Sequence, residues 1–102
     1  MNLTSESELV LALGEASREV ARAQREDWKL FDGRPAADRL TLLSDQLVNA
    51  LQRLKAGEDL SRGEFSGLVR WLTDWIPNVD DPLVEALGKL ERVARAVGGD
   101  AR

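Results

Sequence analysis

The chain has 102 residues with 14 Lys and Arg against 18 Asp and Glu, and it contains neither cysteine nor histidine. The lack of cysteine excludes disulfides and thiolate metal sites, and the lack of histidine excludes the commonest general base and transition-metal ligand. The net charge of −4 argues against direct nucleic-acid binding, because such proteins carry a surplus of Lys and Arg.

One folded domain is expected over residues 1–97, followed by a frayed tail over residues 98–102. The length suits a single hydrophobic core. The first residues contain neither the basic region nor the apolar segment of a secretory signal, and nowhere do apolar residues continue for about 18 positions. A cytoplasmic protein without membrane contact is therefore expected.

The first helix is predicted over about residues 6–30. Ser5 and Glu8 have the spacing of a capping box, in which two side chains satisfy free backbone N–H groups at a helix start. Asp32 and Gly33 form a turn signal that ends this segment.

The second helix is predicted over about residues 35–56. Pro35 suits its first turn, because the missing N–H of proline costs nothing there. Gly57 can adopt the left-handed conformation that often ends a helix. Apolar residues at alternating spacings of three and four form a buried stripe, which consists of Leu40, Leu43, Leu47, Ala50 and Leu54.

The third helix is predicted over about residues 62–75. Ser61 and Glu64 form a second capping box, and Leu60 and Phe65 occupy the two positions of a hydrophobic staple. Both signals indicate the same helix start.

The fourth helix is predicted over about residues 82–97. Pro77 stops the preceding helix by disfavouring helical geometry in the residue before it. Asp81 then offers a cap acceptor, and Pro82 follows at the first helical position. Gly98 closes the helix.

Short connections between these segments favour antiparallel neighbours, so the expected fold is an all-α, antiparallel up-down-up-down four-helix bundle. At about 1.5 Å per residue, the first two helices exceed the last two by roughly 10 Å. The excess falls at the end that holds the first and third connections. The aromatic and apolar residues expected at this end are Trp28, Phe31, Trp71, Trp75 and Ile76.

This aromatic end has three possible roles. The rings can simply close the end of the core, or they can form a surface for a second copy or another protein, because Trp is enriched in binding hot spots. Trp71 lies at the edge of an apolar arc of about 160° and is the aromatic for which partial exposure is most expected. A small-molecule pocket is the third possibility, although no convergent polar groups are evident.

Asp27 is an unusual polar residue on the apolar face of the first predicted helix. It can mark a turn in the chain, cap the next helix, or pair with Arg34 or Arg39. The functional alternative is a buried acid with a raised pKa.

Most charged residues are expected to form solvated ion pairs at helical spacing. The predicted pairs are Glu15–Arg18, Glu19–Arg22, Glu26–Lys29, Glu85–Lys89 and Glu91–Arg95. Asp74, Asp80 and Asp81 cluster near the third connection, but their spacing matches no calcium-binding loop, and capping or turn roles account for them.

The leading hypothesis is a non-enzymatic helical interaction module, an adaptor or a small subunit of a larger assembly, with no cofactor and no metal. Its expected partner is another protein or a second copy of the chain, most simply a dimer. An acidic regulator that occupies a basic, nucleic-acid-facing site of another protein is the alternative. A magnesium-dependent bundle hydrolase would need several acids converging near Asp27. The four-helix pattern does not decide between these functions, because one fold hosts many.

Overall fold

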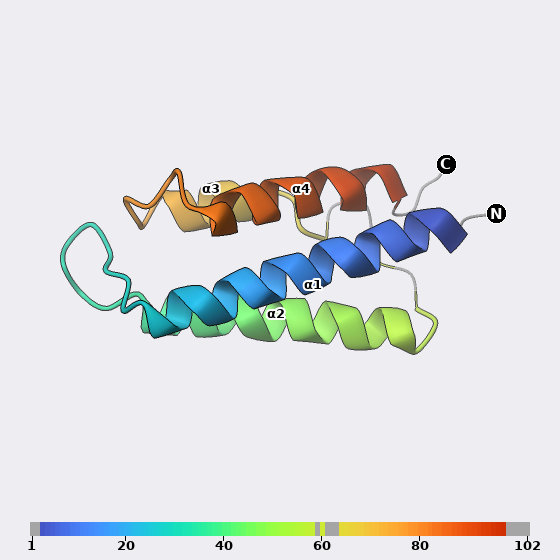
Figure 1. The fold of residues 1–102 in the computed structure, drawn as a ribbon, viewed down its shortest axis with the longest axis horizontal. Coiled ribbons are helices and arrows are strands. Elements are labelled where there is room, and N and C mark those ends of the chain that lie inside the picture. The colour runs from blue at the N-terminus through green and yellow to red at the C-terminus, as the bar shows by residue number, and fades with distance from the viewer. Residues whose placement is uncertain (1–2, 59, 61–63, 98–102) are drawn as a thin grey trace.

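The computed structural model describes residues 3–58, 60 and 64–97, which contain four α-helices (Figure 1). The tail predicted over residues 98–102 lies outside the described residues. Within them, turns and irregular segments connect the helices, and the β-structure is limited to an isolated antiparallel bridge between Lys29 and Pro35. The all-α prediction is confirmed. The helices are α1 (Leu3–Arg25), α2 (Ala37–Lys55), α3 (Leu68–Thr73) and α4 (Pro82–Val97).

The boundaries of α2 and α4 agree with the prediction to within two residues. At the end of α2, Gly57 has a φ of 87° and donates its N–H to Leu54, while Glu58 donates to Arg53. These two bonds satisfy carbonyl groups that the helix leaves free. At the start of α4, an Asp81 carboxylate oxygen accepts the N–H of Leu83 at 2.8 Å, which is the predicted cap.

The predicted bounds of the first helix are wrong at both ends. α1 begins at Leu3, so Ser5 lies inside it rather than at its cap, and α1 ends at Arg25 instead of residue 30. Asp27 adopts a φ of 57°, a left-handed conformation that a right-handed helix cannot continue through. The chain then forms a compact turn in which the N–H of Ala36 donates to the Trp28 carbonyl at 2.8 Å. Pro35 lies in this turn, not in α2.

The third helix is much shorter than predicted. Gly67 has a φ of 77°, so the right-handed helix can begin only after it, at Leu68. Ser61 of the predicted capping box lies outside the described residues, and Glu64 instead forms an ion pair with Arg53 at 3.1 Å. The start of α3 is capped from α4, because the Glu91 carboxylate accepts the N–H groups of Gly67 at 3.2 Å and Val69 at 2.7 Å.

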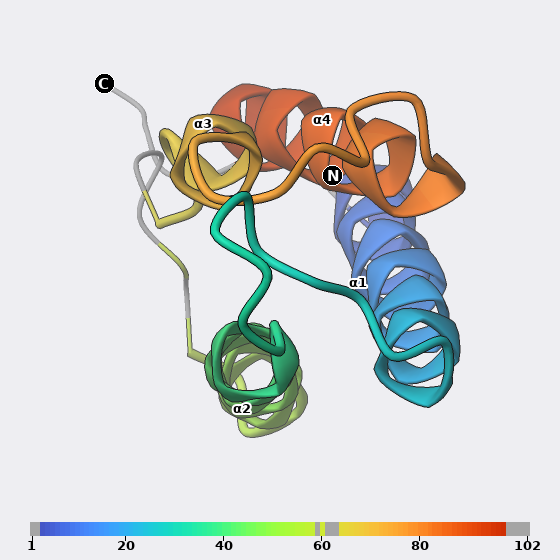
Figure 2. The ribbon, with the colours of Figure 1, turned by 90° about the vertical axis from the view of Figure 1, so that its left-hand side faces the viewer.

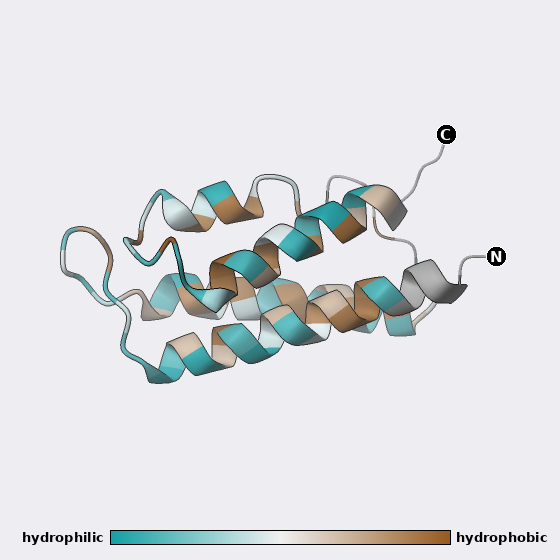
Figure 3. Ribbon diagram, turned by 45° about the horizontal axis from the view of Figure 1, so that its top comes forward, coloured by the Kyte–Doolittle hydropathy of each residue, from teal (hydrophilic) through white to brown (hydrophobic). Residues whose placement is uncertain are grey.

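The four helices form two layers around one core. Seen end-on, α1 and α2 lie side by side in one layer, and α3 and α4 lie in the other (Figure 2). α1 packs against both α2 and α4, and α3 packs against α4. The hydrophobic residues of the helices gather along their inward faces (Figure 3). The largest side chains withdrawn from solvent are Leu9, Leu13, Val20, Leu40, Leu43, Leu47, Phe65, Leu72, Ile76, Leu83, Leu87 and Leu90.

Replacing Asp81 tests how α4 begins. Asp81→Ala removes both the cap of α4 and an ion pair with Arg22, and we expect it to lower the free energy of unfolding by about 1–2 kcal/mol. Asp81→Asn keeps a cap acceptor and loses only the charge, so it is expected to cost about 0.5 kcal/mol. Urea unfolding followed by circular dichroism compares the two variants. If both variants lower the free energy of unfolding equally, the ion pair with Arg22, and not the cap, is what Asp81 contributes to stability.

Candidate interaction site

An open groove lies where the turn after α1, the start of α2 and the end of α3 meet. Its volume is about 750 Å³. A backbone hydrogen bond from the N–H of Phe31 to the carbonyl of Trp75, at 2.9 Å, joins the first and third connections beside it. We call this feature the aromatic groove, and it is lined by Leu30, Arg34, Pro35, Ala37, Asp38, Arg39, Leu42, Trp71 and Trp75.

Arg39 holds the two tryptophans of the groove together. Its guanidinium carbon lies 3.7 Å from the centre of the Trp75 ring and 5.1 Å from that of Trp71. At these distances a cation is attracted to the face of an indole, by about 0.5–1 kcal/mol where solvent is present. The start of α2 at Ala37 positions Arg39 in the first turn of that helix, opposite the end of α3.

The predicted aromatic residues divide between the core and the surface. Trp28 is only 6% exposed and donates its indole N–H to Glu26, and Ile76 is fully buried. Phe31 and Trp75 are 65% and 42% exposed. Trp71 is half-buried and so is partly exposed, as expected, although Phe31 and Trp75 are more exposed.

The sequence did not indicate the parts that Leu42 and Arg39 play in the groove. Leu42 is 62% exposed, and it lies just outside the stripe that includes Leu40 and Leu43. An extra leucine on the polar face of a helix is a signal that could have identified it. Nothing in the sequence indicated that Arg39 stacks on tryptophan, because that contact depends on where α3 lies.

Asp27 is an exposed turn residue, not a buried acid. Its side chain forms an ion pair with Lys29 at 3.1 Å. Because its left-handed backbone ends α1, it does not share the apolar face of that helix. The turn alternative is therefore correct, and the pairs considered with Arg34 or Arg39 are not found.

Arg22 joins the end of α1 to the start of α4. Its guanidinium pairs with Glu26 at 2.7 Å, with Glu19 at 2.8 Å, and with Asp81. Hydrogen bonds to Glu26, Glu19 and Asp81, in that order of effect, raise the pKa of Arg22. The bond from Arg22 and a second from the Trp28 indole lower the pKa of Glu26. The Glu19–Arg22 prediction is confirmed, whereas Glu26 does not pair with Lys29 because α1 ends first.

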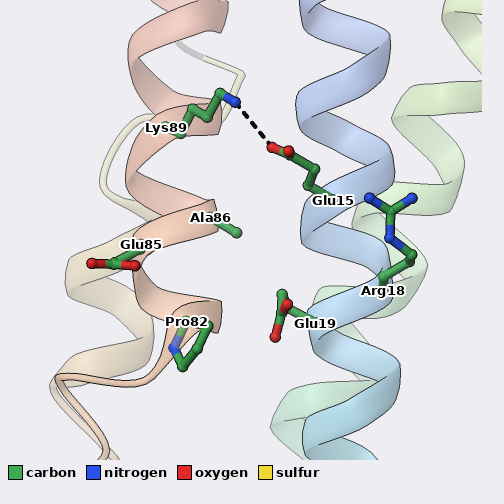
Figure 4. Close-up of a pocket in the computed structure, with 7 residues that line it drawn as sticks. All are labelled: Glu15, Arg18, Glu19, Pro82, Glu85, Ala86 and Lys89. Atoms are coloured by element: carbon green, nitrogen blue, oxygen red, sulfur yellow. Dashed lines mark hydrogen bonds and ion pairs between the residues drawn. The ribbon is translucent and has the colours of Figure 1, made fainter.

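A second, smaller groove between α1 and α4 is charged, with a volume of about 290 Å³ (Figure 4). Glu15 and Lys89 point toward each other across it and pair at 3.1 Å, in place of the predicted pairs with Arg18 and Glu85. Acidic and basic side chains alternate along this surface. In the described part of the chain, no three acidic groups come close enough to hold a metal ion.

No protein-family model matches the chain, and no curated protein or solved structure matches it either. Across the residues that the structure describes, no helix is both long enough and apolar enough to cross a membrane. Inferences about function therefore rest on the geometry of the chain itself.

Proposed function

We propose that the protein is a non-enzymatic helical interaction module, an adaptor or small subunit of an assembly, which self-associates through the aromatic groove. One observation carries the proposal. Phe31, Leu42 and Trp75 are all exposed at one end of the molecule, and Arg39 fixes the Trp75 ring there. Large apolar side chains gathered on one surface favour burial against another protein.

The composition of the groove supports a protein partner. Interface centres are enriched in Trp, Phe and Arg, and tryptophan truncation is among the most damaging changes in known interfaces. Here two tryptophans, one phenylalanine and two arginines occupy the same end of the fold. Because Arg39 already packs on the face of the Trp75 indole, we expect less side-chain entropy to be lost when a partner binds it.

The acidic-regulator alternative is less well supported by the charge distribution. A mimic of nucleic acid needs a contiguous acidic surface. On α1 and α4, Glu15 pairs with Lys89, and Glu19 and Glu26 pair with Arg22. Charges that neutralise one another in this way favour a module whose charged faces serve solubility and orientation.

We also propose that the helices form an antiparallel up-down-up-down bundle in which α3 is a shortened member. The turn between α1 and α2 and the turn between α3 and α4 meet through the Phe31–Trp75 hydrogen bond, which supports this topology. It follows that both turns, and the groove between them, belong to the same end of the bundle.

Trp75→Ala is expected to weaken self-association at least about 30-fold, as befits a tryptophan at the centre of an interface. Sedimentation velocity over a concentration series measures the change. Leu11→Ala is the matched control, because Leu11 is 67% exposed on α1 and does not line the groove. Circular dichroism verifies that both variants remain helical. A wild-type protein that stays monomeric at tens of micromolar would contradict the proposal.

A further inference from the structure

The aromatic groove carries one basic and one acidic side chain in adjacent positions of α2. Asp38 and Arg39 both line it. Among the residues that the structure describes, neither side chain forms an ion pair within 4 Å. Arg34, also in the groove, differs in that Asp32 already binds it at 2.8 Å. Asp38 and Arg39 are therefore the groove charges that have no ion-pair partner in the described part of the chain.

The stacking of Arg39 suits it to receive a carboxylate. A guanidinium that lies over an aromatic ring uses its face for that contact and keeps its in-plane N–H donors available for bidentate hydrogen bonds. Trp75, at 3.7 Å, occupies that face here and limits the freedom of the side chain. An ordered, partly desolvated arginine binds a carboxylate at a smaller entropic cost than a freely mobile one.

A surface with one cation and one anion side by side is complementary to itself. In a two-fold symmetric dimer, each residue that contacts a second residue is contacted by it in return. We infer that two copies of the chain dock groove to groove, with Arg39 of each copy bound to Asp38 of the other, so that two identical ion pairs form. This inference rests on the proposed self-association and specifies its chemistry. A partner with charges of one sign would place a like charge against either Asp38 or Arg39.

Apolar contacts supply the affinity of such a dimer, and the charges set its register. Leu42 and Trp75 line the groove, and the exposed Phe31 is joined to Trp75 by a backbone hydrogen bond, so apolar side chains become covered when the two copies meet. Exposed ion pairs contribute little, but charges enclosed at an interface discriminate strongly against wrongly charged partners. The two-fold axis doubles each effect, because every substitution occurs in both copies.

Charge reversal tests the pairing. Asp38→Lys leaves the Arg39–Trp75 stack intact and makes the groove basic, whereas Arg39→Glu makes it acidic. Each variant alone is expected to bind itself at least about 10-fold more weakly than the wild type, through like-charge repulsion. An equimolar mixture is expected to associate at least about 10-fold more tightly than either variant alone, because opposite charges face each other again, even though one copy lacks the Arg39–Trp75 stack.

Analytical ultracentrifugation of each variant and of the mixture gives the result, with one copy carrying a fluorescent label. Glu8→Lys and Arg95→Glu are controls of equal charge change on exposed residues outside the groove, and they should leave dimerisation unchanged. Circular dichroism checks that all variants are folded. If the wild type dimerises and the mixture associates no more tightly than the single variants, the ion pairing is wrong and the proposed function stands. If the wild type is monomeric, both are wrong.

Discussion

Leu13→Ala is expected to lower the free energy of unfolding by about 2–5 kcal/mol, the range for a buried leucine whose removal leaves a cavity. Leu13 is fully buried on α1, the helix that packs against both α2 and α4. A cavity there removes contacts on two sides of the core. Since a domain of this size is stable by about 5–15 kcal/mol, the variant would lose a large part of its stability.

Leu11→Ala makes the same chemical change two residues earlier on the same helix, where the side chain is mostly exposed. Its expected cost is within about 0.5 kcal/mol. Urea titrations followed by circular dichroism compare both variants with the wild type. Equal losses at Leu11 and Leu13 would mean that the face of α1 assigned to the core is wrong.

Phe65→Ala is expected to cost about 3–5 kcal/mol, as for other buried phenylalanines. Phe65 lies in the turn before α3 and is almost fully buried. Its ring therefore fixes the short α3 segment on the rest of the bundle. Loss of the ring should reduce the stability of the whole domain if the segment folds cooperatively with it.

Phe31→Ala is the matched change at an exposed phenylalanine, and its expected effect on stability is below about 1 kcal/mol. The backbone bond from Phe31 to Trp75 does not depend on the side chain. Thermal unfolding and urea titration of the two variants give the comparison. If Phe65→Ala lowers the free energy of unfolding no more than Phe31→Ala does, the residues around α3 unfold separately from the rest of the domain.

The parts of the fold that were predicted well are those with local signals. Gly57 ends α2 with its own backbone conformation, and Asp81 with Pro82 begins α4 with its own side chain and ring. Each signal acts within a few residues of the helix end it determines. Such signals can be read from a sequence before any tertiary contact is known.

The two mistaken helices depend on information that is not local. α1 stops because Asp27, a residue without the freedom of glycine, adopts a left-handed conformation that the following turn stabilises. α3 is capped by Glu91 from another helix, whereas the sequence predicted that Glu91 forms a surface ion pair with Arg95 on its own helix. A capping residue more than twenty positions away leaves no pattern in a short window of sequence.

The candidate site was predicted in outline but not in detail. Phe31 meets Trp75 where the first and third connections come together, and Trp71 and Trp75 both contact Arg39, because helix lengths and turn positions determine that much. Which rings are buried depends on side-chain direction after each helix ends, and so Trp28 is in the core while Trp75 is on the surface. The contribution of Arg39 requires the relative placement of α2 and α3.

The hydrogen bond between Phe31 and Trp75 joins segments that are 44 positions apart in the chain. The walls of the groove come from the turn after α1, from the first turns of α2 and from the end of α3. A linear peptide copied from any one of these segments would present only a fragment of the surface. Recognition at the groove is therefore recognition of a conformational epitope, which vanishes when the chain unfolds and which cannot be transplanted as a short motif.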